Sequence, residues 1–245
     1  MNFSLSPLGD KAVQILFEEP ISKKLNMHIR RTSDEIINHR LAGVIEVVPA
    51  FRTLTIYYDP MLQSYSNLCI FLTKICEYKF QSDQSFKKEV ISIPVCYGKG
   101  FGEDLSRVAM IHNLTEDEVI KLHAGTQYLV YMIGFLPGFP YLKGLREEIK
   151  TPRLSEPRLN VPRGAVGIGG DQTGVYPIES PGGWNLIGQT PLTLFNPEAN
   201  IPFLIKAGDF IRFVPISEEE FYKIESNVNN GTYVIKRDVV IDEKH

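Results

Sequence analysis

The residues best suited to chemistry are three arginines that each follow a proline directly, at a regular spacing of five residues: Arg153, Arg158 and Arg163. Proline fixes its own backbone angle and pushes the preceding residue into an extended conformation. The side chain of each arginine therefore extends from a stiff stretch of chain. The planar guanidinium group binds a carboxylate or a phosphate through two hydrogen bonds. The spacing therefore predicts a rigid anion-binding segment, and the alternative is a proline-stiffened surface loop with solvated arginines.

The segment around these arginines is unusually rich in turn-forming residues. Residues 134–191 contain 11 of the 19 glycines and 8 of the 16 prolines, together with several aromatic residues. Binding pockets combine aromatic walls with a few fixed polar groups, so we expect a ligand pocket here. We predict that Tyr176 and Trp184 form its walls and that residues 180–183 offer backbone donors. The full predicted lining is Phe135, Tyr176, Ser180, Pro181, Gly182, Gly183 and Trp184.

Other signatures of catalysis are weaker. His123, at the end of a predicted helix, is a candidate proton carrier, although a histidine there could simply complement the helix dipole. The glycine-rich residues 164–174 have Gln172 where a dinucleotide-binding loop needs glycine, and no Gly-Lys-Ser/Thr follows. Their glycines are better explained by bulges and barrel corners, or by a close approach of the backbone to a ligand. No serine-hydrolase or metal-binding motif is present, so we expect no metal site.

Composition and charge exclude several classes of protein. With 26 basic and 29 acidic residues, the net charge of −3 gives too little positive field to bind nucleic acid. No apolar run approaches the roughly 20 residues that span a bilayer, and the N-terminus lacks the features of a signal peptide. We therefore expect a cytoplasmic protein. Its three cysteines include no C-x-x-C pair and are expected to be free, with Cys69 and Cys76 on one buried helix face.

The first part of the chain alternates strands and helices. The pattern predicts β-structure over residues 3–17 around a turn at residues 7–10, then a helix with Ser22 as its N-cap that ends at Gly43. Two strands follow before a second helix over residues 64–80. A further strand is expected at residues 90–96. The order βαββαβ is typical of a ferredoxin-like α/β sandwich. We assign this N-terminal α+β domain to residues 1–88.

The second part begins with two helices and continues as strands. Helices are expected at residues 104–112 and 115–123, with a capping box at residues 115–118 for the second helix. Three carboxylates at the start of this helix argue against a DNA-reading helix. Strands are then expected at residues 127–133, 165–168, 174–177, 192–195, 210–214 and 232–235. So many short strands with turn signals between them predict a closed or nearly closed β-barrel over residues 89–245.

Several longer motifs resemble one known family. These are the nine residues from Gly134 to Leu142, the X-Pro-Arg segments, Tyr176-Pro177, Ser180-Pro-Gly-Gly-Trp184 and Gly188-Gln-Thr-Pro191. Together with the opening residues 7–10, they resemble the allophanate hydrolase subunit 1 family over nearly the whole chain. The resemblance implies an N-terminal α+β domain and a C-terminal cyclophilin-like β-barrel. Such a likeness to cyclophilin concerns the fold only and implies no proline isomerase activity.

The resemblance also implies a function. The family includes the B subunit of bacterial 5-oxoprolinase and a Bacillus inhibitor of a sporulation histidine kinase. The first implies a non-autonomous subunit that works with an allophanate hydrolase subunit 2 relative (the C subunit of 5-oxoprolinase) and with the A subunit of 5-oxoprolinase. The assembled complex would need ATP and Mg²⁺ to convert 5-oxoproline to glutamate, and this chain alone would need neither. The alternative is a regulatory protein that binds and inhibits a histidine kinase.

Within this resemblance the candidate residues receive roles. Arg153 and Arg158 would bind anions, and His123 would carry a proton. One position departs from the family pattern, because Gln189 stands where an arginine is common. The role of Gln189 is therefore open. A third interpretation, part of a biotin-dependent carboxyltransferase acting on urea, is disfavoured because the sequence contains no carboxylase or biotin-carrier segment.

Overall fold

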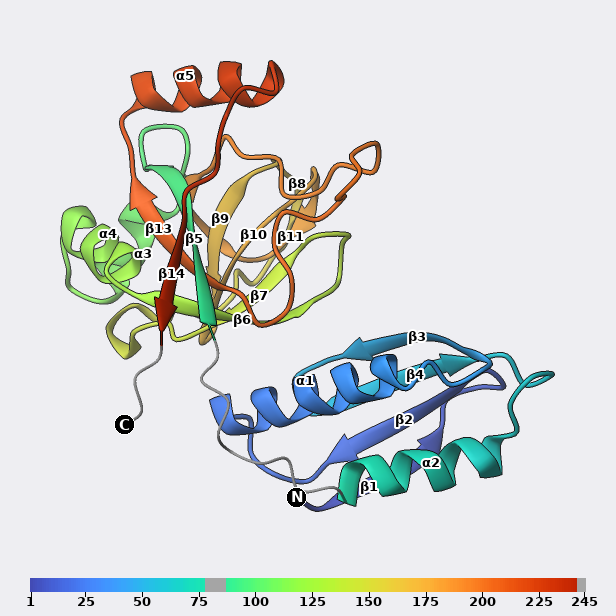
Figure 1. Cartoon of the computed structure of the whole chain (residues 1–245). Helices are drawn as coiled ribbons and strands as arrows, with labels where there is room; N and C mark the ends of the chain where they lie inside the picture. Colours follow the sequence, from blue (N-terminus) through green and yellow to red (C-terminus); the bar gives the residue numbers. More distant parts are fainter. Residues whose placement is uncertain (78–86, 242–245) are drawn as a thin grey trace. The chain divides into compact units, whose positions relative to one another are not determined.

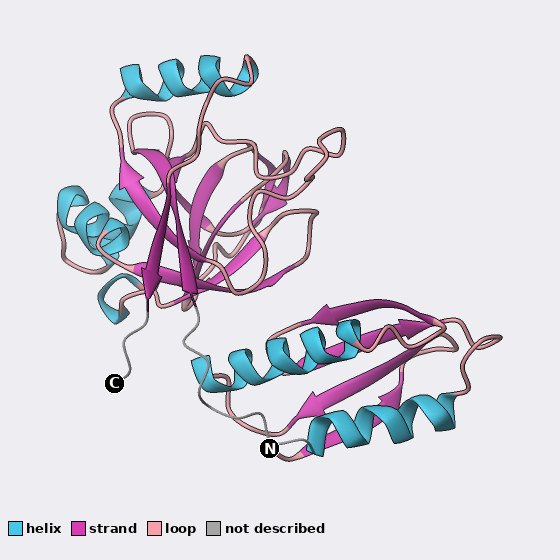
Figure 2. Ribbon diagram, viewed as in Figure 1, coloured by secondary structure: helices cyan, strands magenta, loops and turns pink. Residues whose placement is uncertain are grey.

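The computed structural model describes residues 1–77 and 87–241 (Figure 1). The chain divides into two compact units, Met1–Gln84 and Ser85–His245. The first combines a small sheet with two helices, and the second is a β-barrel with helices on its outside (Figure 2). The predicted mixed α+β class is therefore confirmed. Among the described residues, no helix is long and apolar enough to cross a membrane.

The N-terminal unit is a four-stranded antiparallel sheet in the order β1-β2-β4-β3. Its helix α1 begins where Ser22 accepts a hydrogen bond from the backbone N–H of Leu25, as the sequence predicts. Alternate residues of β2 are fully buried against the helices, which gives the unit its own core. The elements are β1 (Phe3–Pro7), β2 (Ala12–Phe17), α1 (Lys23–Asn38), β3 (Val44–Pro49), β4 (Thr53–Tyr58) and α2 (Tyr65–Glu77).

The predicted order βαββαβ is wrong at both ends of this unit. Residues 3–17 form two paired strands, because the chain reverses at Gly9, whose φ of 64° suits glycine. Strand β1 thereby fills the sheet edge beside β2. The strand expected at residues 90–96 is β5 (Lys87–Tyr97), which pairs in the barrel instead. The observed order is therefore ββαββα.

Seven strands of the second unit close into a barrel, which confirms the predicted closed architecture. The ring runs β12-β9-β10-β7-β6-β13-β5 and closes by pairing of β12 with β5. Strands β5 and β13 are parallel, and β14 (Arg237–Ile241) adds to β5 outside the ring. The other ring strands are β6 (Gln127–Ile133), β7 (Pro140–Lys143), β9 (Ala165–Gly169), β10 (Gln172–Val175), β12 (Asn185–Gln189) and β13 (Phe210–Pro215).

A separate two-stranded ribbon lies beside the barrel. It consists of β8 (Arg158–Val161) and β11 (Ser180–Gly182), which pair only with each other. The sequence pattern did not predict this ribbon, nor β7 and β12, because glycine and proline obscure the alternation in short strands. Two predicted strands are wrong: residues 192–195 form only an isolated bridge, from Phe195 to Phe203, and residues 232–235 precede β14.

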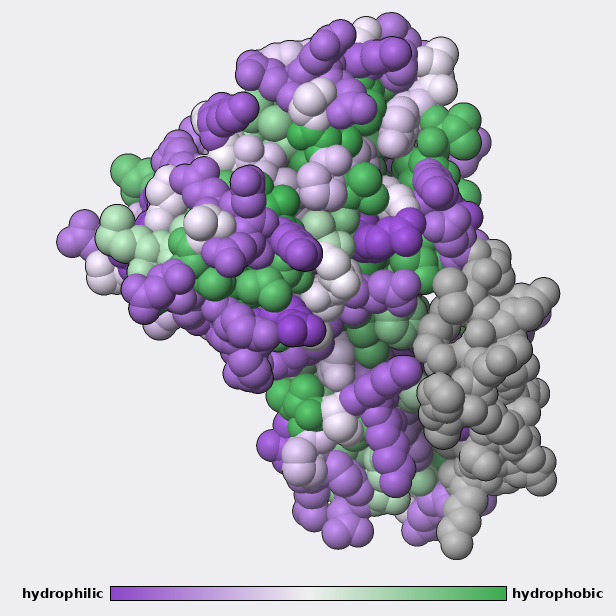
Figure 3. Space-filling model, turned by 90° about the vertical axis from the view of Figure 1, so that its left-hand side faces the viewer, coloured by the Kyte–Doolittle hydropathy of each residue, from purple (hydrophilic) through white to green (hydrophobic). Residues whose placement is uncertain are grey.

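The helices of the barrel unit are α3 (Leu105–Ile111), α4 (Glu116–Ala124) and α5 (Glu218–Asn229), with a 3₁₀ turn, η1 (Glu147–Ile149). The predicted capping box at the start of α4 is confirmed, with Thr115 and Glu118 bonding each other's backbone N–H. Helix α5 was not predicted, although Ser217 and Glu220 form the same motif. The face that carries α3 and α4 is mostly hydrophilic, with apolar side chains in separate areas (Figure 3).

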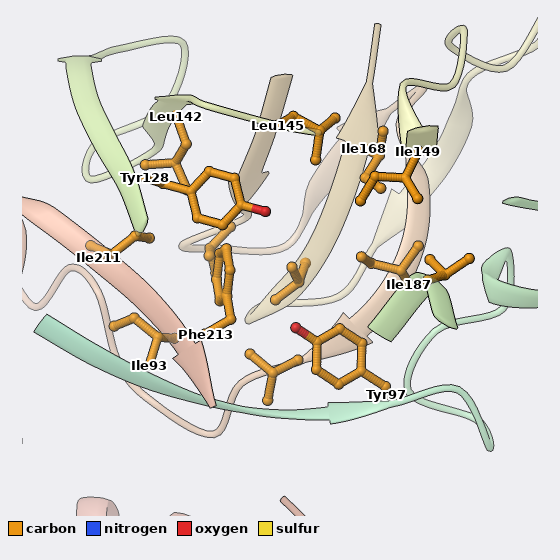
Figure 4. Packing of buried hydrophobic residues seen from close by; sticks show 14 of the residues in the cluster. Ile93, Tyr97, Tyr128, Leu142, Leu145, Ile149, Ile168, Ile187, Ile211 and Phe213 are labelled. Atoms are coloured by element: carbon orange, nitrogen blue, oxygen red, sulfur yellow. The ribbon is translucent and has the colours of Figure 1, made fainter. Parts of the chain in front are cut away.

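The barrel core contains a polar network among its apolar side chains. The Tyr97 and Tyr128 hydroxyl groups both point into the interior (Figure 4). The Tyr97 oxygen lies 2.7 Å from His123 Nδ1, and His123 Nε2 lies 2.9 Å from Thr173 Oγ1. Because Thr173 donates its proton to the Gly167 carbonyl, its oxygen accepts from Nε2–H, and Nδ1 accepts from the tyrosine. The His123 imidazole is therefore neutral.

Burial strongly lowers the pKa of His123. The imidazole is fully buried and stacks on Phe213 at a centroid distance of 4.5 Å. Desolvation of the charged form lowers the His123 pKa from 6.5 to about 3. The unfolded chain therefore binds a proton between these values and the folded chain does not. This group's contribution to stability is complete above pH 6.5 and decreases as the pH falls toward 3.

We expect His123→Gln to reduce the acid sensitivity of folding. In the wild-type chain, this histidine alone should add a slope of up to about 1.4 kcal/mol per pH unit to the free energy of unfolding between about pH 4.5 and 6. The variant should be less stable at pH 7 but lose that slope. Urea unfolding over this pH range measures it, with the exposed His39→Gln as control. Equal slopes for wild type and His123→Gln would contradict the neutral assignment.

Candidate functional site

The predicted aromatic residues of the glycine-rich segment lie together around Trp184. The rings of Phe139 and Tyr176 meet the indole edge to face, with centroids 5.5 and 6.4 Å away, and Tyr141 lies at 6.4 Å. Such arrangements stabilise aromatic clusters beyond the burial of their surface. Trp184, Phe139 and Tyr176 are nearly completely buried. The predicted wall residues Tyr176 and Trp184 therefore belong to one buried aromatic cluster on the barrel unit, and their role in a ligand pocket stays a prediction.

Glycines on two barrel strands make room for this indole. A Cβ atom at Gly169 on β9 would lie 2.5 Å from Trp184 Nε1, and one at Gly174 on β10 would lie 3.0 Å from the ring. At Gly167, a Cβ atom would come within 3.1 Å of the Trp184 Cβ. The distance at Gly169 excludes a side chain, and those at Gly174 and Gly167 leave room for one only if the tryptophan shifts. The three glycines therefore allow Trp184 to pack closely against the strands. The glycine-rich segment thus serves close packing.

The loop before β7 presents an aromatic side chain to solvent at the edge of the cluster. Phe135 has φ of 65°, a strained conformation for a residue other than glycine, and 65% of it is exposed. Its ring meets Phe139 edge to face at 5.8 Å. Gly138 allows the loop to approach the barrel, because its Cβ would lie 2.9 Å from that of Phe195. Phe135 is therefore an outer neighbour of the aromatic cluster.

Arg153 covers the exposed side of the cluster. Its guanidinium carbon lies 5.8 Å from the centroid of the Trp184 ring, within the range of a cation–π contact. The backbone of the preceding Pro152 is fixed by Asn185. The side-chain amide of Asn185 donates to the Pro152 carbonyl oxygen at 2.9 Å and to the Ile168 carbonyl oxygen at 3.1 Å. The first X-Pro-Arg unit therefore holds an exposed cation over the aromatic wall.

Arg158 is held by a buried carboxylate. Its Nη2 atom donates to Asp104 Oδ1 at 2.8 Å and lies 3.5 Å from the Glu103 carboxylate. The other oxygen of Asp104 accepts from the backbone N–H of Leu186 at 2.7 Å. The hydrogen bond to Asp104 raises the pKa of Arg158. The guanidinium group is thus permanently charged and fixed in position, so Arg158 is ordered rather than simply solvated.

The third unit has a different environment. Arg163 is exposed and donates to Thr193 Oγ1 at 2.9 Å. Gln189 donates to the Arg163 carbonyl oxygen at 2.7 Å, so this side chain supports the backbone of the third unit. The three arginines that the sequence presents as equivalent therefore have three different partners.

The β8–β11 ribbon brings Arg158 to the aromatic cluster. In the register of the ribbon, Gly182 lies opposite Arg158. A Cβ atom at Gly182 would lie 2.4 Å from the Tyr176 hydroxyl oxygen, so glycine permits this approach. Burial raises the pKa of Tyr176, although a hydrogen bond from the Trp184 backbone and the charges of Arg153 and Arg158 oppose the rise. Two cations therefore act on one buried tyrosine.

The structure does not bring His123 to this site. Its two ring nitrogens are both hydrogen-bonded inside the barrel, to Tyr97 and Thr173. With a pKa of about 3 and no exposed atom surface, the imidazole is placed to stabilise the core. The sequence suggested His123 as a proton carrier because it stands at the end of a predicted helix near the glycine-rich segment. Its burial depends on how that helix packs on the barrel, which the sequence position does not show.

Two residues of the site were missed by sequence reasoning. Asp104 and Asn185 are buried polar side chains that fix Arg158 and the chain before Arg153. The only signal for Asp104 was its place as the first residue of the helix expected at residues 104–112, where an acidic side chain ordinarily complements the helix dipole. Nothing in the sequence relates either residue to the arginines, because their contacts span 54 and 33 positions.

Elsewhere on the barrel unit there is a concavity of about 450 Å³ that contains none of the predicted site residues. It is lined by Leu114, Glu118, Lys121, Leu122, Gly125, Thr126 and Arg146. Glu118 is already engaged in the capping box, and Arg146 is bonded to Glu148. The described residues also include no group of three or more His, Cys, Asp or Glu side chains that could hold a metal ion.

Comparison with known proteins identifies the class. Residues 3–205 match the family described as the carboxyltransferase domain, subdomain C and D. The chain is 43% identical to the B subunit of 5-oxoprolinase from Bacillus subtilis, over 93% of this chain and 99% of that protein. It is 39% identical to the protein of the same name from Escherichia coli O157:H7, over 86% and 95%. The chain therefore belongs to this family, the allophanate hydrolase subunit 1 family of the predicted resemblance.

Solved structures agree with this family. The crystal structure of TTHA0988 is 34% identical with a TM-score of 0.74, and the match covers 84% of this chain but 40% of that one. Kluyveromyces lactis urea carboxylase shares the fold at 20% identity, with a TM-score of 0.80. That match covers 98% of this chain and 24% of the larger protein. The chain thus spans less than half the length of each of these two solved structures.

We expect Gly169→Ala to displace Trp184. The added methyl group would overlap the indole, so the variant should lose about 1 to 3 kcal/mol of stability. Because the chain has one tryptophan, its fluorescence spectrum reports this site alone and should shift to longer wavelength. Thermal unfolding and fluorescence measure the two effects. Gly183→Ala is the matched control, because its Cβ would make only ordinary contacts with Pro157. An unchanged spectrum and an unchanged melting temperature for Gly169→Ala would contradict the close packing of Trp184 against Gly169.

Proposed function

We propose that this chain is the B subunit of a 5-oxoprolinase, the enzyme that opens the lactam ring of 5-oxoproline to give glutamate. The main support is the identity of 38–43% to proteins named as the B subunit of 5-oxoprolinase, over 86–93% of this chain. These relatives are named as parts of an enzyme, so the alternative of a histidine kinase inhibitor is not favoured. The name of the relatives also implies further subunits.

The site around Trp184 supports a role in binding an anionic substrate. It combines an aromatic cluster with Arg153 above it and Arg158 beside Tyr176. 5-Oxoproline carries a carboxylate, and a guanidinium group is the side chain that binds carboxylates best. In our proposal the arginines bind and orient the anion, and the aromatic side chains exclude water from it. The exposed Phe135 would contact either substrate or a partner protein at the edge.

ATP and Mg²⁺ belong to the assembled complex in this proposal. The glycines that might have cradled phosphate groups are packed against Trp184. No cluster of acidic side chains suited to a metal ion is present in the described residues. We therefore assign nucleotide and metal binding to the partners, namely the subunit 2 relative (the C subunit) and the A subunit. We also assign the closed barrel to the cyclophilin-like type that the family resemblance implies, and the N-terminal unit to a ferredoxin-related arrangement.

The first test of the proposal is reconstitution. The purified chain should show no ATP-dependent opening of 5-oxoproline, because its sequence contains no nucleotide-binding loop. Adding the A and C subunits should produce turnover, measured as glutamate formed. The A and C subunits without this chain are the control. Turnover by the isolated chain, or full activity of the other two subunits in its absence, would contradict the proposal.

The second test concerns Arg153. Replacing Arg153 with alanine removes an exposed cation whose ring contact contributes little to folding, so the melting temperature should stay within about 2 °C. Loss of one charge-assisted contact to the substrate should lower kcat/KM of the reconstituted complex about 10-fold to 100-fold. Arg163→Ala is the matched control from the third X-Pro-Arg unit and should keep normal turnover. Equal activity of both variants would remove Arg153 from the site.

A further inference from the structure

Two polar atoms on the β8–β11 ribbon are buried and, among the described residues, have no hydrogen-bond partner. They are Nη1 of Arg158 and Oγ of Ser180, whose residue is 9% exposed. A buried donor without a partner is unfavourable and rare, so such a group indicates an interaction that the free chain does not complete. Both atoms lie on the same ribbon, so one ligand with two acceptor oxygens would complete both.

The ribbon places the two side chains on one face. Gly182 is opposite Arg158, and Ser180 is two residues before Gly182 on the same strand. Residues two apart on a strand point to the same side, as do residues directly opposite each other. The register shift between Ser180 and Gly182 leaves an extra residue on β8, and Val161 is the residue opposite Ser180. Gly182 has no side chain, and the Tyr176 hydroxyl group takes that place beside Arg158, because a Cβ atom at Gly182 would lie 2.4 Å from the hydroxyl oxygen.

The rest of the Arg158 guanidinium group is fixed by Asp104. One terminal nitrogen of the guanidinium group, Nη2, donates to Asp104 Oδ1. The other carboxylate oxygen, Oδ2, accepts from the backbone N–H of Leu186. Asp104 is therefore a positioning residue: it sets the guanidinium plane and leaves Nη1 for another acceptor. The free Nη1 and the Ser180 hydroxyl can each donate a hydrogen bond.

We propose that Arg158 Nη1 and Ser180 Oγ form a subsite for a compact oxyanion, and that its ligand is the carboxylate of the lactam substrate. Two donors match the two oxygens of a carboxylate. The identity of the ligand rests on the proposed function, whereas the anion chemistry rests on the ribbon itself. The other source of an oxyanion would be a phosphate group, which the experiment distinguishes.

Access to the subsite requires the ribbon to move. Both atoms are shielded from solvent, but β8 and β11 are strands of four and three residues that lie outside the closed ring. Short elements with few ladder bonds open more easily than the barrel. Binding of the carboxylate therefore displaces the ribbon and then closes it over the ligand.

The test is Ser180→Ala in the reconstituted complex. The carboxylate contact exists in the ground state and the transition state alike, because it is remote from the ring carbonyl, so its loss should raise KM and leave kcat nearly unchanged. We expect KM for 5-oxoproline to rise about 10-fold with kcat within about 2-fold, at an unchanged melting temperature. Ser155→Ala, an exposed serine of the same segment, is the control. An unchanged KM for Ser180→Ala overturns the subsite while the proposed function stands.

A second measurement separates the subsite from the proposed function. The fluorescence of Trp184 in the full chain should respond to 5-oxoproline in a saturable way, and the affinity should weaken about 10-fold in Ser180→Ala. 2-Pyrrolidinone, the same lactam without a carboxylate, should give no response. If reconstitution yields no turnover but this pattern holds, the subsite is supported and the function fails. Equal binding of 2-pyrrolidinone, no response to 5-oxoproline, or tighter binding of inorganic phosphate would overturn the carboxylate assignment.

Discussion

The site depends on one packing contact, that between the indole of Trp184 and the strands beneath it. The glycines of β9 and β10 leave the space that the ring fills, and a methyl group at Gly169 would already overlap it. Once the ring is seated, Phe139 and Tyr176 pack on its edges and Arg153 on its outer side. A close contact of this kind converts two ordinary barrel strands into the floor of an aromatic site.

A second constraint places a charged side chain, Arg158, beside the aromatic cluster. Asp104 stands at the start of α3, yet its carboxylate binds the backbone of β12 and the side chain of Arg158. This buried carboxylate is satisfied by two donors, as a desolvated charge must be. The helix, the barrel and the ribbon therefore meet at one ion pair. Its effect is to hold a guanidinium group beside Tyr176, where an anionic ligand would meet both a charge and an apolar wall.

The barrel interior shows the opposite use of polar residues. Tyr97 and Thr173 satisfy both ring nitrogens of His123, Thr173 donates to the Gly167 carbonyl oxygen, and burial keeps the imidazole neutral. Such a network contributes to a unique core packing but leaves no group free for a substrate. The contrast with the ribbon is informative, because Arg158 and Ser180 each retain a buried donor without a partner. The incomplete set of contacts is the reason that we propose the ribbon, and not the barrel interior, as the place where a ligand binds.

The sequence by itself determined the two-part organisation, the closed barrel, the helix caps of α1 and α4 and the family, because these depend on local periodicity, capping and long motifs. It also indicated the segment in which we propose the site. Tertiary structure alone decided that β1 rather than β5 completes the first sheet, that His123 is a core residue, and that Asp104 fixes Arg158. The physical reason is that each of these features depends on contacts between segments far apart in the chain. Periodicity and residue spacing indicate local structure and do not predict which distant segments pack together.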